Sequence, residues 1–285
     1  WILSSKIKRL ETEKQIKIEE ERYRTLLDNS MDAIIVVSDE KILYANPRAA
    51  ELLGYDDKKD LIGIGSLTHV APEFKKEVRE NMDARFRGVD APNRYELQLM
   101  RKDGSRVDVE INVSRIIFNG EVSSLSIVRD ISIKKNYIRR LEALHQHALR
   151  LDHAATLSDV TSITLEIMRQ LIDAEFASFQ ILYGNELRVE DTLGNPPLNI
   201  PIYIDGKGIT AKAAREKKTL LVNDLRNDPD FIKGSTDSLS ELVVPIMDDK
   251  KVLGVLNVES EKLDAYTDEH KQLLEILASH VAYAL

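Results

Sequence analysis

The stretch YELQLMRKDGSRVDVEINVSRIIFNGEVSSLSIVRDIS, residues 95–132, decides the fold of the first half of the chain. It contains three β-rich runs, at residues 95–101, 106–117 and 122–131, separated by two short polar connections. One connection contains Asp103-Gly104 and the other is Asn119-Gly120, and both pairs supply the positive φ that tight hairpin turns need. The stretch therefore predicts three consecutive antiparallel strands.

Upstream of this stretch, the pattern predicts two more strands, at residues 33–37 and 41–44. Asn46-Pro47 is typical of a helix start, and Gly54 is typical of its end. A second helix is predicted at residues 73–87, because its apolar residues recur on one face. Two strands, helices and three strands together predict an α+β domain in which helices cover one side of a five-stranded antiparallel sheet.

The segments LLDNSMDAIIVVSDEKILYANPRAAELLGY (26–55), LIG (61–63), RKDGSRVDVEINV (101–113) and RDIS (129–132) occur in this order, and residues 22–133 resemble a PAS domain. The resemblance implies a ligand cavity between the sheet and the helices, although an ordinary filled core is an equally simple interpretation. The residues expected to face this cavity are Met82, Phe86, Tyr95, Leu97, Ile111 and Ile127.

Residues 130–151, DISIKKNYIRRLEALHQHALRL, predict a helical connector. In PAS domains, a triplet like Asp130-Ile131-Ser132 joins the last strand to an outgoing helix. Apolar residues then follow at alternating spacings of four and three, which indicates a heptad seam. We expect these residues to relay a signal between the two halves of the chain: Asp130, Ile131, Ser132, Tyr137, Leu141, Leu144, Ala148 and Leu151.

The second half predicts another α+β domain, with a first helix capped by Ser158 or Asp159, several strands, a hairpin at 240–247 and 252–259, and a final helix from Thr267. The segments GKGITAKAAREKKTLLVNDLRNDPDF (206–231), LVVPIMDDKKVLGVLNVES (242–260) and YTDEHKQLLEILASHVAYAL (266–285) resemble a GAF domain. The residues expected to line its pocket are Phe179, Ile181, Asn223, Asp224, Phe231 and Val244, with a filled core again as the alternative.

The predicted organisation is thus an N-terminal signalling helix at 1–22, a PAS domain at 23–133, a connector at 134–151 and a GAF domain with a C-terminal helix at 152–285. In the N-terminal segment, Leu3, Ile7 and Leu10 fit either a short coiled coil or a solvated single helix. Since the chain begins at Trp1 without an initiator methionine, we expect it to be part of a longer protein, which leaves a membrane segment upstream open.

Composition excludes several kinds of chemistry. The 285 residues contain no cysteine, which rules out thiolate catalysis, a thioether-linked bilin and flavin–cysteinyl photochemistry. A formal net charge of −8 argues against a nucleic-acid partner. His69 is a candidate haem ligand, but the resemblance does not favour this role. His145, His147 and His153 fall on different helix faces, which predicts surface or interface positions and no shared metal.

The resemblance to PAS and GAF domains implies a cytoplasmic sensory region that binds a small ligand or a partner and passes a conformational signal to an output domain, most commonly a histidine kinase. It is expected to form a homodimer through its N-terminal, connector and C-terminal helices, the last because Leu273, Leu277, Val281 and Ala284 keep a four-three spacing. The region itself is expected not to be an enzyme. The alternatives are a dimerisation scaffold with unoccupied pockets and a GAF-type small-molecule enzyme, whose known examples use cysteines.

Overall fold

The computed structural model describes residues 14–285 except 16, 20, 39, 195–200 and 234–236. The chain divides into two compact units between Tyr137 and Ile138, and each unit has its own sheet and its own core. Residues 21–28 are helical, whereas the predicted seam at Leu3, Ile7 and Leu10 lies outside the described residues.

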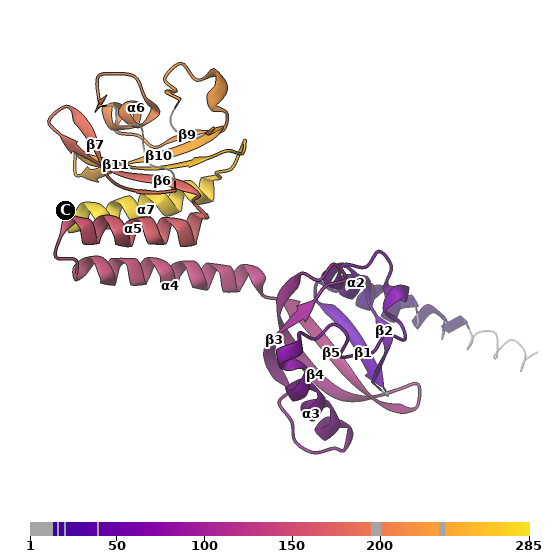
Figure 1. Ribbon diagram of the computed structural model, residues 1–285. Helices are drawn as coiled ribbons and strands as arrows, with labels where there is room; N and C mark the ends of the chain where they lie inside the picture. The colour runs from indigo at the N-terminus through magenta and orange to yellow at the C-terminus, as the bar shows by residue number, and fades with distance from the viewer. Residues whose placement is uncertain (1–13, 16, 20, 39, 195–200, 234–236) are drawn as a thin grey trace, which may run out of the picture. The chain divides into compact units, whose positions relative to one another are not determined.

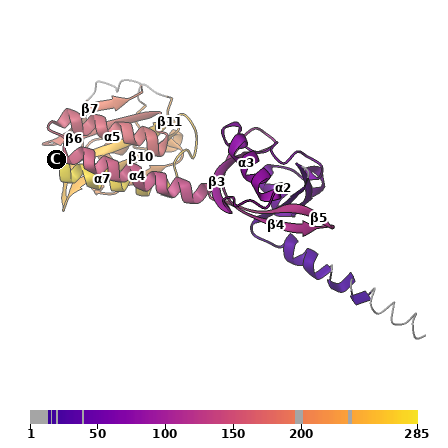
Figure 2. The same ribbon diagram turned by 90° about the horizontal axis from the view of Figure 1, so that it is seen from below.

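The first unit is built around a five-stranded antiparallel sheet, which confirms the predicted fold class. The strand order is β2-β1-β5-β4-β3, so the last strand of the unit lies at the centre of the sheet. Its elements are β1 (Ala33–Ser38), β2 (Lys41–Ala45), α2 (Pro47–Leu53), η1 (Lys58–Leu61), η2 (Pro72–Phe74), α3 (Lys75–Phe86), β3 (Arg94–Met100), β4 (Arg106–Phe118) and β5 (Glu121–Asp130). Figures 1 and 2 show α2 and α3 on one face of this sheet.

Asn46 connects the helices to the sheet. Its fully buried side chain accepts hydrogen bonds from the backbone amides of Ala49, at 3.0 Å, and Ile34, at 2.9 Å. Its amide nitrogen donates to the carbonyls of Leu27 and Asp32. The same residue therefore caps α2 and holds the first strand, and a buried polar group with its hydrogen bonds made costs little to bury.

The second unit contains a six-stranded antiparallel sheet in the order β8-β7-β6-β11-β10-β9. Helices cover both faces: Figure 1 shows α5 and α7 on one face, with α4 outside them, and α6 on the other. The elements are α4 (Ser132–Asp152), α5 (Leu157–Ile172), β6 (Phe176–Tyr183), β7 (Glu186–Leu193), β8 (Ile202–Tyr203), α6 (Ile209–Glu216), β9 (Leu220–Val222), η3 (Leu225–Asn227), β10 (Ser240–Asp248), β11 (Lys251–Ser260) and α7 (Asp268–Ala284).

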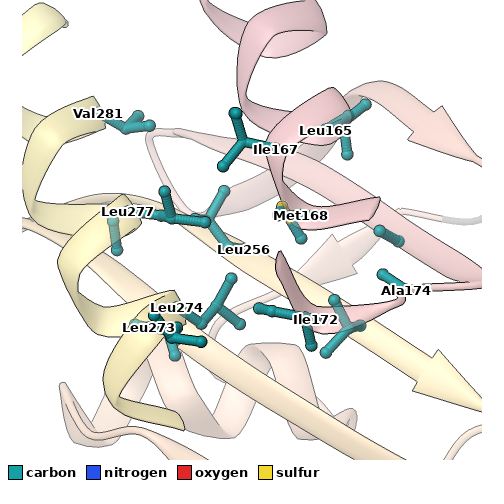
Figure 3. Close-up of a cluster of buried hydrophobic side chains, with 14 of the residues drawn as sticks. Leu165, Ile167, Met168, Ile172, Ala174, Leu256, Leu273, Leu274, Leu277 and Val281 are labelled. Atoms are coloured by element: carbon teal, nitrogen blue, oxygen red, sulfur yellow. The ribbon is translucent and has the colours of Figure 1, made fainter. Parts of the chain in front are cut away.

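The core of this unit lies between the sheet and the pair α5 and α7. Figure 3 shows Met168 and Ile172 from α5 facing Leu274 and Leu277 from α7, next to Leu256 of β11. All five side chains are buried, and their close packing fixes the two helices on the sheet.

The cap of α5 differs from the prediction. Thr156, and neither Ser158 nor Asp159, is the N-cap residue. Its hydroxyl accepts a hydrogen bond from the amide of Asp159, and the Asp159 carboxylate accepts one from the amide of Thr156. Asp159 therefore belongs to a capping box one turn into the helix, where a short acidic side chain reaches back to the free amides.

The predicted heptad seam of the connector is divided between two environments. Leu144 and Leu151 are buried in the core of the second unit, and Ala148 is half-buried. Tyr137 and Leu141 are 63% and 49% exposed. The four-three spacing thus partly reflects packing within the unit, because an intramolecular contact and a coiled coil use the same helix face.

The C-terminal pattern has the same explanation. Leu273, Leu277 and Val281 of α7 are buried in the core of the second unit, so this part of the predicted intermolecular seam is used within the chain. The part of the chain that the structure describes contains no helix both long and apolar enough to span a bilayer.

Candidate functional site

The first unit has a cavity of about 80 Å³ between α3 and the sheet. Of the predicted residues, Met82, Tyr95 and Ile111 line it. Leu97 is buried in the surrounding core, and Phe86 packs against that core, but neither lines the cavity.

The prediction that the Ile127 side chain faces the cavity is wrong. This residue is 39% exposed, whereas its neighbours Ser126 and Val128 line the cavity. Successive side chains of a strand point to opposite faces, so an assignment shifted by one residue places the side chain in solvent.

Several polar side chains also line the cavity, and most of them were not predicted from the sequence. Arg85 is only 8% exposed, and Ser124 and Ser126 belong to the central strand β5. Burial raises the pKa of the Tyr95 hydroxyl, and the cationic Arg85 beside it opposes that rise. The sequence contained a signal for Arg85, since it lies three residues after Met82 and therefore on the same helix face.

His69 lines the cavity, but its ring nitrogens are both engaged. Nδ1 lies 3.0 Å from the carbonyl oxygen of Met100, so it donates, and Nε2 lies 3.2 Å from the hydroxyl of Tyr55, from which it accepts. A haem iron would need a free nitrogen lone pair, which this arrangement does not offer. His69 as placed therefore does not fit a haem ligand.

Only some of the residues predicted to line a pocket in the second unit are brought together. Phe179, Ile181 and Val244 belong to the core under α5 and α7, and Phe231 packs in a smaller core with α6. Asn223 is exposed.

Asp224 pairs with Arg226. Its carboxylate accepts two hydrogen bonds from that guanidinium, at 2.8 and 2.7 Å. These bonds, together with one from the backbone amide of Arg226, lower the pKa of Asp224 to about 2.

The opposite face of the second sheet contains a different set of polar residues, in which Glu241 is the most deeply buried carboxyl. Asn257 is 4% exposed, its amide nitrogen donates to Glu259 at 3.1 Å, and its Oδ1 has no hydrogen-bond partner in the described chain. Gln180, on the adjacent β6, also leaves its Oε1 without a partner among the described residues. We define this group as the GAF polar set: Ser178, Gln180, Glu241, Asn257 and Glu259.

Burial raises the pKa of Glu241 well above its usual value, and repulsion from Glu259, its direct cross-strand partner, adds to the rise. The buried Glu241 carboxyl, the two unpaired amide oxygens and the half-buried Glu259 beside them would attract a hydrogen-bond donor or a cationic group. This set could not be predicted from hydrophobicity, because β10 and β11 are covered on both faces and their sequences are nearly continuous apolar runs.

The start of α4 is held by the first unit. The Asp130 carboxylate accepts a hydrogen bond from the amide of Ser132 at 2.8 Å, and the amide of the buried Ile131 donates to the carbonyl of Asp108 at 3.0 Å. One turn further on, Lys135 pairs with the carboxylates of Glu96 and Asp108. These contacts fix the direction in which the helix leaves the sheet.

The later part of α4 is held by the second unit. His147 is fully buried, which corrects the expectation of a surface or interface position. Its Nδ1 lies 3.2 Å from Nδ1 of His280 in α7, and its Nε2 lies 3.3 Å from the Thr164 hydroxyl in α5. Since the Thr164 hydroxyl donates to the carbonyl of Val160 at 2.7 Å, it accepts from Nε2, and His147 is the neutral Nε2–H tautomer.

The chain thus contains two α+β domains, each built on an antiparallel sheet, and the first has a cavity between its sheet and its helices. The family model for a PAS domain matches residues 31–132, and the model for a GAF domain matches residues 154–285. The chain is therefore a PAS domain followed by a GAF domain.

Two relatives that span most of the chain are sensors. The oxygen sensor protein DosP of Escherichia coli is 26% identical over 235 residues, which cover 78% of this chain and 28% of DosP. The methyl sulfide methyltransferase-associated sensor of Methanosarcina acetivorans is 23% identical over 278 residues, which cover 90% of this chain and 28% of that protein. The chain thus spans 28% of the length of either sensor.

A third relative corrects the prediction that this region is not an enzyme. The free methionine-R-sulfoxide reductase of Saccharomyces cerevisiae is 29% identical over 135 residues, which cover 45% of this chain and 73% of the reductase. The GAF half thus resembles an enzyme over most of that enzyme's length, and this finding contradicts the exclusion of catalysis.

Proposed function

We propose that this chain is the sensory region of a larger signalling protein, in which a small ligand changes how helices pack and so controls an output domain. The proposed output is a histidine kinase of a two-component system, which is the commonest output that the resemblance implies. The cytoplasmic location stays a prediction.

The observation that most directly supports this proposal is the continuity of α4. It is one helix from Ser132 to Asp152, its first turn is hydrogen-bonded to the PAS domain, and its later turns are buried in the GAF core. A helix held in this way resists rotation at both ends. A shift at the Asp130 end would therefore displace the residues of α4 that pack in the GAF core.

Exposed apolar side chains near the start of α4 support the proposed homodimer. Ile133, Tyr137 and Leu141 recur every four residues and are 89%, 63% and 49% exposed. This stripe differs from the predicted seam, because it includes Ile133 and does not include Leu144 and Leu151, which are buried. A second copy of the chain would cover these residues with its own stripe.

The test is to insert residues into α4 directly after Tyr137 in the full-length protein. One inserted residue should rotate the following helix by about 100° and change the output, whereas seven should nearly restore the original face. The measurement is the activity of the output domain with each insertion. Equal activity of the two variants would show that α4 does not transmit rotation.

The GAF polar set supports a second candidate function, the binding of a small molecule with a donor-rich or cationic group. The reductase relative suggests a free amino acid of the methionine sulfoxide type as the probe. Binding to the chain would be measured by calorimetry, with reductase activity assayed in the same samples. Glu241→Gln should weaken binding, and the exposed Glu216→Gln should not; equal affinity in both variants would exclude the set as the site.

A further inference from the structure

Arg85 is a buried cation without a carboxylate partner. It is 8% exposed, its Nη2 donates to the carbonyl of Pro92 at 2.7 Å, and its other neighbour is the Tyr95 hydroxyl. Among the described residues, no Asp or Glu has a carboxylate oxygen within 4.0 Å of the Arg85 guanidinium, which is the limit for an ion pair. A cation removed from water without a counter-ion destabilises the folded state, whereas an apolar side chain of similar size would not.

The surroundings of Arg85 suit an anion with an apolar tail. Beyond the guanidinium, the cavity is lined mainly by aliphatic residues such as Ile35, Val78 and Val113, and the hydroxyls of Ser124 and Ser126 lie on its sheet side. A cavity of about 80 Å³ has room for roughly five to eight water-sized positions. This corresponds to a carboxylate with a tail of about three to five carbons.

Arg85 also lines a second, more open pocket of about 390 Å³, with Arg115, Asn93 and Asp90 among its other residues. Arg85 is thus shared by the cavity and the outer pocket. Two arginines against one aspartate in the outer pocket favour the approach of an anion. The same guanidinium could then hold the carboxylate while the tail enters the cavity.

We propose that the PAS cavity binds a short aliphatic carboxylate, with the carboxylate paired to Arg85 and the tail among the aliphatic residues of the sheet and α3. A planar guanidinium matches a carboxylate through two parallel hydrogen bonds, and such charge-assisted bonds are strong in a buried position. The binding of the carboxylate does not depend on the proposed sensory function. Only its role as the signal rests on that function.

The test compares hexanoate with hexanamide, an uncharged molecule of the same shape, by calorimetry on the 285-residue chain. Hexanoate should bind at least about tenfold more tightly. Arg85→Met should abolish this preference, Arg85→Lys should weaken hexanoate binding while keeping the charge, and Arg115→Gln, which changes only the outer pocket, should retain the preference.

Equal affinity for the two probes, or a preference that survives Arg85→Met, would overturn the carboxylate assignment. Failure of both probes to bind would also overturn it. None of these results would affect the insertion test in α4, which needs no ligand, so the two proposals fail separately. If Arg85→Met does not fold, Arg85→Lys still decides, because it keeps the cation and removes the planar pair of donors.

Discussion

Acidification should destabilise the GAF domain through His147. Burial is the main cause that lowers the pKa of this imidazole from 6.5 to about 4, and the neighbouring His280 contributes. The folded state therefore keeps His147 neutral, while the unfolded chain takes up a proton as the pH falls below 6.5. The stability that follows from this difference is present above pH 6.5 and is lost progressively as the pH falls towards 4.

The magnitude follows from the two pKa values. At pH 5, linkage predicts a loss of about 2 kcal/mol of unfolding free energy from this one residue. His147→Gln removes the titrating group but leaves an amide that can still bond to Thr164. The unfolding free energy of this variant should therefore fall by about 2 kcal/mol less than that of the wild-type chain when the pH is lowered to 5. His145→Gln is the matched control, because His145 is exposed on the same helix.

The assay is urea unfolding of the chain at pH 7.5 and pH 5, followed by circular dichroism. Leu277→Ala, which removes a buried side chain of α7, identifies which transition belongs to the GAF domain. If the wild-type and His147→Gln chains lose the same stability between the two pH values, the buried neutral histidine is not the cause.

Three further substitutions test other parts of the structure. Asp130→Ala removes the hydrogen bond to the amide of Ser132; both domains should stay folded, with a loss below about 1 kcal/mol in urea, and an unchanged output of the full-length protein would contradict the role of this junction. Glu241→Gln should stabilise the chain at pH 7, because the folded pKa of Glu241 is raised and the stability that its carboxyl contributes at low pH is lost as the pH rises through that folded pKa; a melting temperature at pH 7 below that of the wild-type chain would refute this. Gly254→Ala would place a Cβ in overlap with the carbonyl oxygen of Gln180 on the adjacent strand, so β6 and β11 should separate and the variant should be recovered mainly as insoluble protein.

Most of the PAS fold could be predicted because its signals are local. The turn at Asn119-Gly120 has positive φ at both residues, and Gly54 ends α2 in the left-handed conformation, as the sequence indicates. Each of these positions depends on the backbone preference of one or two residues, so no knowledge of distant contacts is needed.

The candidate sites could be predicted only in part, because they depend on which face of a sheet is covered. In β5, Ile127 is the larger apolar residue, yet the small Ser126 faces the cavity. In β10, the run from Leu242 to Ile246 is buried on both faces and shows no alternation. Hydrophobicity alone could not place Val244 under the helices and Glu241 on the opposite face.

The burial of Leu144, His147 and Leu151 in the GAF core means that the folding unit is longer than the matched family segment, which begins at residue 154. A fragment cut at that residue would lose the helix that covers α5 and α7, and would expose apolar surface to other molecules. Excision of the GAF domain for separate study should therefore start near Ile138, where the compact unit begins.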